Sequence, residues 1–225
     1  MTRGARRSSV SGPRPDGAAT RASLLEAAGP VFAEHGFDRA TAKEIALRAG
    51  ANAAAVNYHF GGIAPLYAEV LAEAHRRLVN YQALARAASV DTDPKDRLRR
   101  LIGLLVRVVR SQGDASWPAR LIARELVSPT PHFERLRREE LEPKKALVFG
   151  VIAEIMGVST DHPLVAQAAL SIMAPCFMLL IAERRLSEVM PPLGRGHVSN
   201  ERLAARLAAF ALGGIAQLAS GEDEA

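Results

Sequence analysis

Several residues between positions 41 and 60 have side chains that could contact the edges of DNA bases. Asn57 could make a pair of hydrogen bonds to adenine, and Lys43 could reach a guanine or a phosphate. The methyl group of Ala55 could touch a thymine methyl. These side chains act together only if the backbone holds them on one surface, which requires defined helices around them.

The start of the first of these helices is marked by a capping pair. Thr41 and Glu44 have the spacing of a capping box, in which the hydroxyl and the carboxylate each accept a hydrogen bond from an amide at the helix start. Ala46 then provides a small side chain where a second helix must cross closely. The pattern predicts a helix that begins at Thr41.

The residues that follow predict a tight turn and a second helix. Gly50 can adopt the positive φ that ends the first helix, and Asn52 can cap the second. Val56 is spaced to pack back onto Ile45 and Ala49. These offsets predict a helix-turn-helix that reads DNA, although an ordinary helical hairpin needs small residues at the same places.

The flanking segments favour the DNA-reading alternative. They are TRASLLEAAGPVFAEHGFDRA before the motif and NYHFGGIAPLYAEVL after it, and together they resemble the N-terminal domain of the TetR family of transcriptional regulators. The resemblance covers residues 20–70. The matching residues are Ala33, Gly36 and Phe37 at the end of the first helix, Ile45 and Ala46 in the second, and Tyr58, His59 and Phe60 at the end of the third.

The resemblance also implies which groups contact phosphates: Tyr58, His59, the Thr41 hydroxyl and the amides at the start of the fourth helix. The sequence departs from the family at the reading helix, which presents mostly alanines, and at Ile63, where a lysine is common. The candidate DNA-binding residues are Thr41, Lys43, Asn52, Ala53, Ala55, Asn57, Tyr58 and His59.

Residues 1–19 form a basic arm with arginines at positions 3, 6, 7 and 14 among Gly, Ser and Pro. The arm has too little apolar area to offset its ordering entropy, so we expect it to be disordered in the free protein. It could lie in a flanking minor groove or along phosphates, or serve only as a solubilising tail. The expected domains are the arm (1–19), the helix-turn-helix domain (20–64), a helical ligand-binding and dimerisation domain (65–220) and a tail (221–225).

The composition fits a helical DNA-binding protein of the cytoplasm. The chain has 225 residues, a net charge of +5 and a pI near 9.9, which favours a polyanionic partner but would also fit a membrane surface. A single cysteine suits a reducing compartment, and the arginine-bearing N-terminus lacks the apolar stretch of a signal peptide. We expect an all-α fold of about nine helices in two domains.

Capping residues and prolines set the expected helix limits. The first helix should run from Thr20 to His35 and bend or break near Gly29, because Pro30 removes one hydrogen bond. A connecting helix should start after Gly62, with Pro65 in its first turn, and continue to about Ala87. Further helices should begin at Asp93-Pro94 and at Ser116, a gap should lie at Pro129–Pro131, and a helix containing Pro143 should stop at Gly157.

Two apolar helices are expected near the C-terminus. Residues 163–182 are long and apolar enough for a membrane span, but Gln167, Pro175 and a cap at Asp161 favour a buried helix. The last helix, 199–220, carries an apolar stripe. The family resemblance implies that both helices pair with those of a second subunit in a four-helix bundle. The candidate dimer residues are Leu203, Leu207, Phe210 and Gly214.

Segments of the C-terminal half resemble the CecR-type subgroup of the same family. They include ARELVSPTPHFERL at 123–136 and EPKKALVFGVIAEIMG at 142–157. The resemblance implies a pocket for a largely apolar small molecule, and Pro175 can open space in the eighth helix by freeing the carbonyl of Ser171. The candidate pocket residues are Trp117, Arg124, Phe133, Met173, Phe177 and Met178, each of which could equally be core packing.

No feature of the sequence favours an enzyme. It has no metal-ligand spacing, no glycine-rich phosphate loop and no paired carboxylates in an apolar setting, and Cys176 lies in an apolar run where a thiol is usually inert. We therefore expect no cofactor. The predicted function is a homodimeric regulator, most simply a repressor, that binds a palindromic operator and is released by a small molecule; the alternative is a regulator gated by a protein partner.

Overall fold

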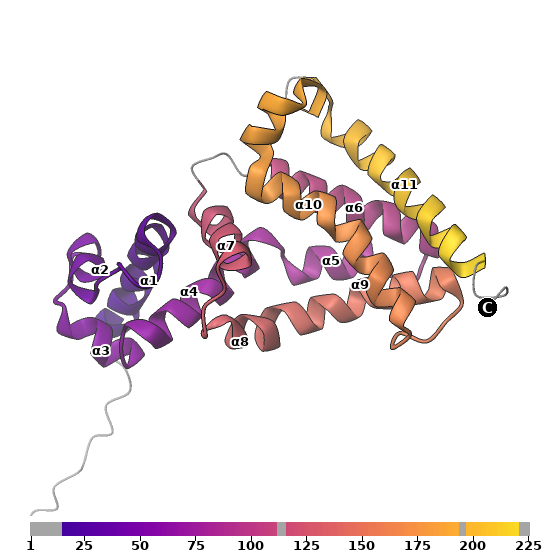
Figure 1. The fold of residues 1–225 in the computed structure, drawn as a ribbon. Coiled ribbons are helices and arrows are strands. Elements are labelled where there is room, and N and C mark those ends of the chain that lie inside the picture. Colours follow the sequence, from indigo (N-terminus) through magenta and orange to yellow (C-terminus); the bar gives the residue numbers. More distant parts are fainter. Residues whose placement is uncertain (1–14, 112–115, 194–196, 221–225) are drawn as a thin grey trace, which may run out of the picture. The chain divides into compact units, whose positions relative to one another are not determined.

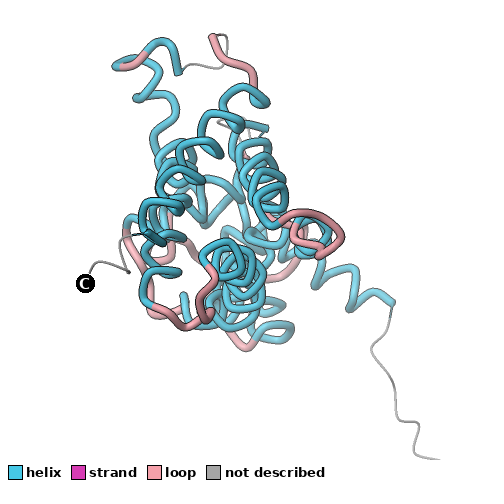
Figure 2. Tube along the Cα trace, turned by 90° about the vertical axis from the view of Figure 1, so that its right-hand side faces the viewer, coloured by secondary structure: helices cyan, strands magenta, loops and turns pink. Residues whose placement is uncertain are grey.

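The computed structural model describes residues 15–111, 116–193 and 197–220, and the regular secondary structure in these ranges is helical throughout (Figures 1 and 2). The α-helices are α1 (Pro15–His35), α2 (Ala42–Arg48), α3 (Ala54–Phe60), α4 (Ile63–Leu78), α5 (Tyr81–Ala87), α6 (Pro94–Ser111), α7 (Trp117–Val127), α8 (Phe133–Leu136), α9 (Glu142–Met156), α10 (Pro163–Val189) and α11 (Asn200–Ser220). A π-helical turn (Arg137–Leu141) joins α8 to α9, and a 3-10 turn (Pro191–Leu193) follows α10. The all-α prediction is confirmed.

The chain divides into two compact units, Met1–Tyr67 and Ala68–Ala225, where we expected a boundary between residues 64 and 65. The predicted arm of residues 1–19 differs from the structure at its end, because α1 already begins at Pro15. The four arginines of the arm lie at or before position 14, outside the described residues. The tail at 221–225 lies outside them as well.

The first unit is built around the inner faces of α1, α2, α3 and the first turn of α4. Its fully buried side chains include Phe32 of α1, Ile45 of α2, Val56 of α3 and Tyr67 of α4. The ring of Tyr67 meets that of Phe32 edge to face at 4.8 Å and that of Phe37 at 5.1 Å. Such aromatic pairs contribute about 0.5–1.5 kcal/mol beyond the area they bury, so Tyr67 fixes the start of α4 within this unit.

The predicted break in α1 does not occur, because the helix runs without interruption through Pro30. A proline inside a helix costs about 3 kcal/mol. Val31 and Phe32, which follow it directly, are completely buried. Burying two such side chains contributes roughly 1.5–3 kcal/mol each, which offsets the lost hydrogen bond and keeps this turn helical.

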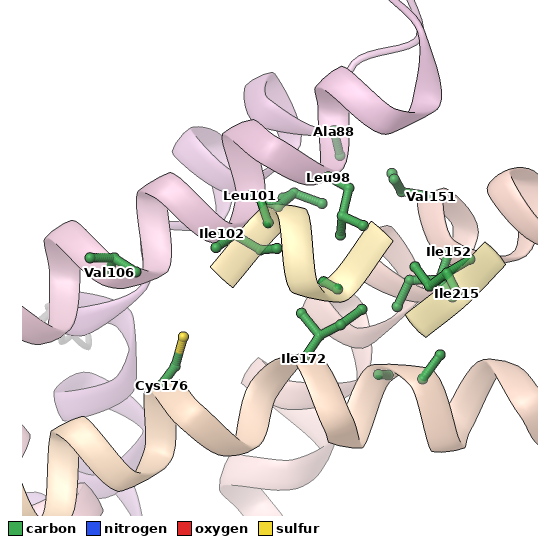
Figure 3. Packing of buried hydrophobic residues seen from close by; sticks show 14 of the residues in the cluster. Ala88, Leu98, Leu101, Ile102, Val106, Val151, Ile152, Ile172, Cys176 and Ile215 are labelled. Carbon is green, nitrogen blue, oxygen red and sulfur yellow. The ribbon is translucent and has the colours of Figure 1, made fainter. Parts of the chain in front are cut away.

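The second unit packs α6, α9, α10 and α11 around one apolar core. Figure 3 shows Leu98 and Ile102 of α6 and Ile172 of α10 pointing toward one another, with Ile152 of α9 and Ile215 of α11 beside them. All five have at most 8% of their surface exposed. This core holds the four long helices in a fixed relation.

Local capping explains where the predicted helix limits hold and where they fail. α6 and α7 begin as expected, and Gly157 ends α9 with φ 71°. The predicted connecting helix to Ala87 is instead two helices, because the Asn80 side chain accepts a hydrogen bond from the Ala83 amide and starts α5. At α10 the cap is His162, whose Nδ1 accepts from the Leu164 amide, and not Asp161.

The apolar segment 163–182 is only partly a buried helix. In α10 and α11 alike the sequence is long and apolar enough to cross a membrane, a test that core helices of soluble proteins also pass. Only 28% of the apolar window of α10 and 22% of that of α11 is buried. α10 continues beyond the predicted end to Val189, with non-helical dihedral angles at Ala182. Each of the two helices therefore has one face in the core and one exposed apolar face.

Truncating the centre of the second unit should weaken the fold. Ile152→Ala removes a side chain with no exposed surface, and we expect it to lower the free energy of unfolding by about 2–5 kcal/mol in urea titrations at fixed protein concentration. The control is Val90→Ala, at a side chain that is 80% exposed, which should change stability by less than about 0.5 kcal/mol. Equal effects of the two substitutions would contradict this description of the core.

Candidate nucleic-acid interface and apolar cavity

The cap of α2 forms only half of the predicted capping box. Thr41 has extended dihedral angles, and its hydroxyl oxygen accepts a hydrogen bond from the Glu44 amide at 3.2 Å. The Glu44 carboxylate turns away from the cap, to Arg48 at 2.8 Å and His35 at 3.3 Å. A guanidinium is a stronger partner for a carboxylate than a backbone amide is, which explains the difference.

The turn between α2 and α3 has the backbone that the sequence predicts. Gly50 has φ 66°, and the Ala51 amide donates to the carbonyl of Ala46 at 2.8 Å. The Asn52 side-chain oxygen accepts from the Ala54 amide at 2.9 Å, although the residue that immediately precedes α3 is Ala53. Asn52 therefore satisfies an amide at the start of α3 from one position further back than a standard cap.

The inner faces of α2 and α3 are apolar and the outer face of α3 is open. Val56 has no exposed surface. Asn57 and Tyr58 are exposed, Tyr58 to 85%, and Ala55 is half-buried. The His59 ring meets the Tyr58 ring edge to face at 4.9 Å and is half-buried. Ala53 and Asn57 are one helical turn apart, and both are exposed. Asn57 therefore extends further from this face of α3 than the short side chain of Ala53 does.

Two arginines of this unit contact other side chains of the unit. Arg48 of α2 bridges Glu34 of α1 at 3.0 Å and Glu44 at 2.8 Å, and its hydrogen bond to Glu34 is the main reason that its pKa is raised. The guanidinium of Arg21 lies over the Phe60 ring, 4.6 Å from its centre. Lys43 and Thr41 are exposed on the same unit. The Glu44 and Arg48 spacing of four residues was the sequence signal for the bridge within α2.

An apolar cavity of about 160 Å³ lies within the second unit. Of the candidate pocket residues, Phe133 of α8 and Met173 and Phe177 of α10 line it. The remaining lining side chains come from α4, α6, α7, α8, α10, the π-helical turn and the link that follows α4. They are His75, Leu78, Val79, Leu105, Val108, Val109, Ile122, Glu125, Leu126, Leu136, Leu141, Cys176 and Leu180. Burial raises the pKa of Cys176 to about 11, so its thiol stays protonated.

The other three candidate pocket residues do not line the cavity. Met178 follows Phe177 directly, so the helix turns it outward, and it is half exposed. Arg124 is exposed beside the buried Glu125 for the same reason. Trp117 lies near the start of α7, where the Arg77 guanidinium sits over its ring at 5.2 Å. The sequence pattern supplied the residue types but not the face of each helix that turns inward.

Two polar residues, His75 and Glu125, also line the cavity. Neither was predicted from the sequence. The Glu125 carboxylate is buried and accepts hydrogen bonds from the Thr130 amide at 2.8 Å and hydroxyl at 2.9 Å. Burial and then the charge of Lys144 lower the pKa of His75 to about 3, so its ring is neutral at pH 7. Within the described residues no group of three or more His, Cys, Asp and Glu side chains could hold a metal ion.

A buried ionic cluster adjoins His75. Lys144 of α9 lies 2.9 Å from the Nδ1 of His75 and 2.7 Å from a carboxylate oxygen of Glu140 in the π-helical turn. The other oxygen of Glu140 accepts from Arg76 at 3.1 Å. The only sequence signal for the cluster was the spacing of four residues between Glu140 and Lys144.

A separate groove of about 300 Å³ runs between α10 and α11. Three of the candidate dimer residues, Leu207, Phe210 and Gly214, line it, and Phe210 is 79% exposed. Leu203 does not, because its side chain is buried in the core of the second unit. Ser171 and Gln217 are the polar residues of a lining that is otherwise apolar.

Family models match both halves of the chain. Residues 24–70 match the model of bacterial regulatory proteins of the tetR family, and residues 94–215 match the C-terminal domain of the HTH-type transcriptional dual regulator CecR. The sequence has no significant match among curated proteins.

Solved structures share the fold at low sequence identity. The fatty acid degradation regulator FadR from Bacillus halodurans superposes with a TM-score of 0.62 at 17% identity, over 86% of this chain and 98% of that one. SmeT, the repressor of the Stenotrophomonas maltophilia multidrug efflux pump SmeDEF, gives 0.61 at 22% identity, over 87% and 91%. A complex of SmeT with triclosan gives 0.61 at 21% identity, over 86% and 91%.

The turn between α2 and α3 should depend on glycine. Gly50→Ala places a side chain in the left-handed conformation, so we expect the free energy of unfolding to fall by about 1–2 kcal/mol in urea titrations, although nothing within 4 Å would clash. The control Gly17→Ala lies in α1 at ordinary contact distance from the His59 ring and should leave stability unchanged or raise it by up to about 1 kcal/mol. A Gly50→Ala variant as stable as the original chain would show that this turn does not hold its positive φ.

Proposed function

Because the chain belongs to the TetR family of transcriptional regulators, which are DNA-binding proteins and not enzymes, we propose that it is a small-molecule-responsive repressor that binds a palindromic operator as a homodimer. The observation that carries the proposal is the exposed outer face of α3, held on an apolar inner face by the turn at Gly50. We expect the protein in the cytoplasm, where its DNA lies.

Base reading would rest on few side chains. Asn57 is exposed on α3 and is the residue of that face able to make paired hydrogen bonds to adenine. Thr41, Lys43, Asn52 and Tyr58 are exposed around it and supply groups for phosphates and sugars. The small side chains of Ala53 and Ala55 would let α3 pack closely against the DNA. His59 would pack beside them and contact a phosphate.

A homodimer would cover the apolar outer faces of α10 and α11. Leu170, Met178 and Phe210 are each at least 50% exposed, and the groove between the two helices is lined mostly by apolar side chains. A second copy placing its own α10 and α11 there would form a four-helix bundle about a two-fold axis. It would also set two copies of α3 about 34 Å apart, which is the spacing of successive major grooves.

Ligand control would pass along α4. This helix begins directly after Gly62 in the first unit and carries His75 of the cavity in the second. SmeT has been solved in complex with triclosan, which supports a small-molecule site in a protein of this fold. A molecule in the cavity that displaced α4 would weaken operator binding by the roughly 1–3 kcal/mol typical of such coupling.

Removing Asn57 should relax sequence preference. For Asn57→Ala we expect a loss of about 1–3 kcal/mol on the operator selected from random DNA, because one pair of base contacts disappears. Binding to unrelated DNA at the same salt concentration should change little. Fluorescence anisotropy with both DNAs measures the difference in affinity. An equal loss of affinity for both would mean that Asn57 contacts a phosphate or stabilises the fold.

A leucine on the outer face of α11 should prevent dimer formation. Gly214→Leu meets no atom of its own subunit within 4 Å, so the protomer should fold while the bundle cannot close. We expect monomers in sedimentation experiments and a loss of operator binding, because one half-site binds weakly. The control is Ala205→Leu, nine residues away on the opposite face of α11, which should remain dimeric. A dimeric Gly214→Leu variant would move the interface elsewhere.

A further inference from the structure

The apolar cavity of the second unit has two polar residues among its lining, and their states define what a ligand can meet there. This inference rests on the proposed role of the cavity as the ligand site. Glu125 already accepts two hydrogen bonds from Thr130, at 2.8 and 2.9 Å, from the loop that follows α7. His75 lies on α4 with 13% of its side chain exposed, and burial keeps its ring neutral.

The proton of the neutral His75 ring is fixed on one nitrogen. Lys144 lies 2.7 Å from the Glu140 carboxylate, an ion-pair distance at which its amine is an ammonium group. An ammonium group donates hydrogen bonds and cannot accept them. The nitrogen that Lys144 contacts at 2.9 Å, Nδ1, must therefore be the acceptor, and the ring proton lies on Nε2.

The contacts of Glu140 keep this arrangement in place. Its second oxygen accepts from Arg76 at 3.1 Å, so the carboxylate is held from α4 and from α9 at once. Lys144 and Glu140 are both at least 90% buried, and removing either partner would leave a buried charge uncompensated. The cluster therefore acts on the cavity through the tautomer of His75.

The Nε2–H group of His75 makes no hydrogen bond with the described residues. The other lining side chains apart from Glu125 are hydrocarbon, thioether or thiol. A ligand of hydrocarbon alone would leave this donor without a partner, whereas a ligand with a carbonyl, ether or similar oxygen would satisfy it. An ammonium group would meet a ring that has no free acceptor and a neighbouring positive charge on Lys144.

We propose that the cavity binds an apolar molecule carrying one hydrogen-bond acceptor, and that the Nε2–H of His75 donates to that acceptor. Lys144 and Glu140 are positioning residues, because they set the tautomer of His75 without contacting the ligand. The discrimination is between acceptor-bearing molecules and their hydrocarbon or ammonium counterparts of the same shape.

The test compares three probes with one alkyl chain: 2-octanone, 2-methyl-1-octene, in which the oxygen is replaced by CH₂, and 2-aminooctane. Dissociation constants are measured by calorimetry on the full chain without DNA. His75→Phe should raise the dissociation constant of 2-octanone relative to that of 2-methyl-1-octene by about threefold to tenfold, which corresponds to the loss of one hydrogen bond. The control His197→Phe makes the same change at an exposed histidine that does not line the cavity, and it should leave this ratio unchanged.

A second measurement uses the unaltered protein, in case His75→Phe disturbs the fold. Nitrogen-15 NMR of the imidazole rings should show His75 protonated at Nε2, and its Nε2–H resonance should move on addition of 2-octanone but not of 2-methyl-1-octene. Protonation at Nδ1, an unchanged probe ratio in His75→Phe, tightest binding of 2-aminooctane, or binding of none of the probes would each overturn the proposal.

The same probes separate this inference from the proposed function. In one case, the protein binds 2-octanone more tightly than 2-methyl-1-octene, as expected, while its affinity for the operator stays unchanged. That result would support the hydrogen bond from His75 and contradict the control of DNA binding through the cavity. In the opposite case, 2-methyl-1-octene releases DNA as well as 2-octanone does, and the ratio of their dissociation constants is the same in His75→Phe. That result would support control through the cavity and contradict the hydrogen bond from His75.

Discussion

The burial of α4 is the constraint on which the two units both depend. Leu66 and Tyr67 in the first unit have no exposed surface, and neither do Val70, Leu71 and Ala74 in the second. A helix buried over consecutive turns cannot shift one residue without moving its neighbours, because protein interiors are close-packed. Each part of α4 is therefore held in place by the packing of the unit to which it belongs.

The ionic cluster beside His75 lies where regular helix geometry fails. Pro143 has no amide hydrogen to offer to the carbonyl of Glu139, and the turn before it is π-helical. Glu140 and Leu141 belong to that turn, and they reach the cluster and the cavity respectively. A buried ion pair adds little stability compared with apolar packing of the same size. Its consequence here is a fixed proton position on His75.

Local features were predictable from the sequence because they depend on neighbours in the chain. The Thr41 cap and the positive φ of Gly50 and Gly157 follow from residue types within a few positions. The cap at Asn80 was equally local, but the apolar pattern that continues past it favoured one long helix. The break predicted at Pro30 was wrong for another reason. Burial of the neighbouring side chains outweighs the local tendency of proline to interrupt a helix.

The cavity was harder to predict because it depends on contacts between distant segments. His75 and Lys144 are separated by 69 positions, and each alone is typical of a solvated helix face. Phe177 and Met178 are equally apolar, so composition could not say which of them turns inward. Leu203 has the spacing of the exposed stripe on α11, yet the packing of α6 against α11 draws it into the core.

α10 takes part in the core, the cavity and the groove. Ile172 packs in the core, Met173 and Phe177 line the cavity, and Ser171 and Pro175 line the groove beside α11. These residues alternate around one helix within two turns, so a rotation that makes room for a ligand at Met173 also moves Pro175. If a ligand binds in the cavity as proposed, it would therefore act on two surfaces of the second unit, the α4 side through His75 and the groove side through α10. The second route would alter the spacing of the two reading helices in a dimer without any displacement of α4.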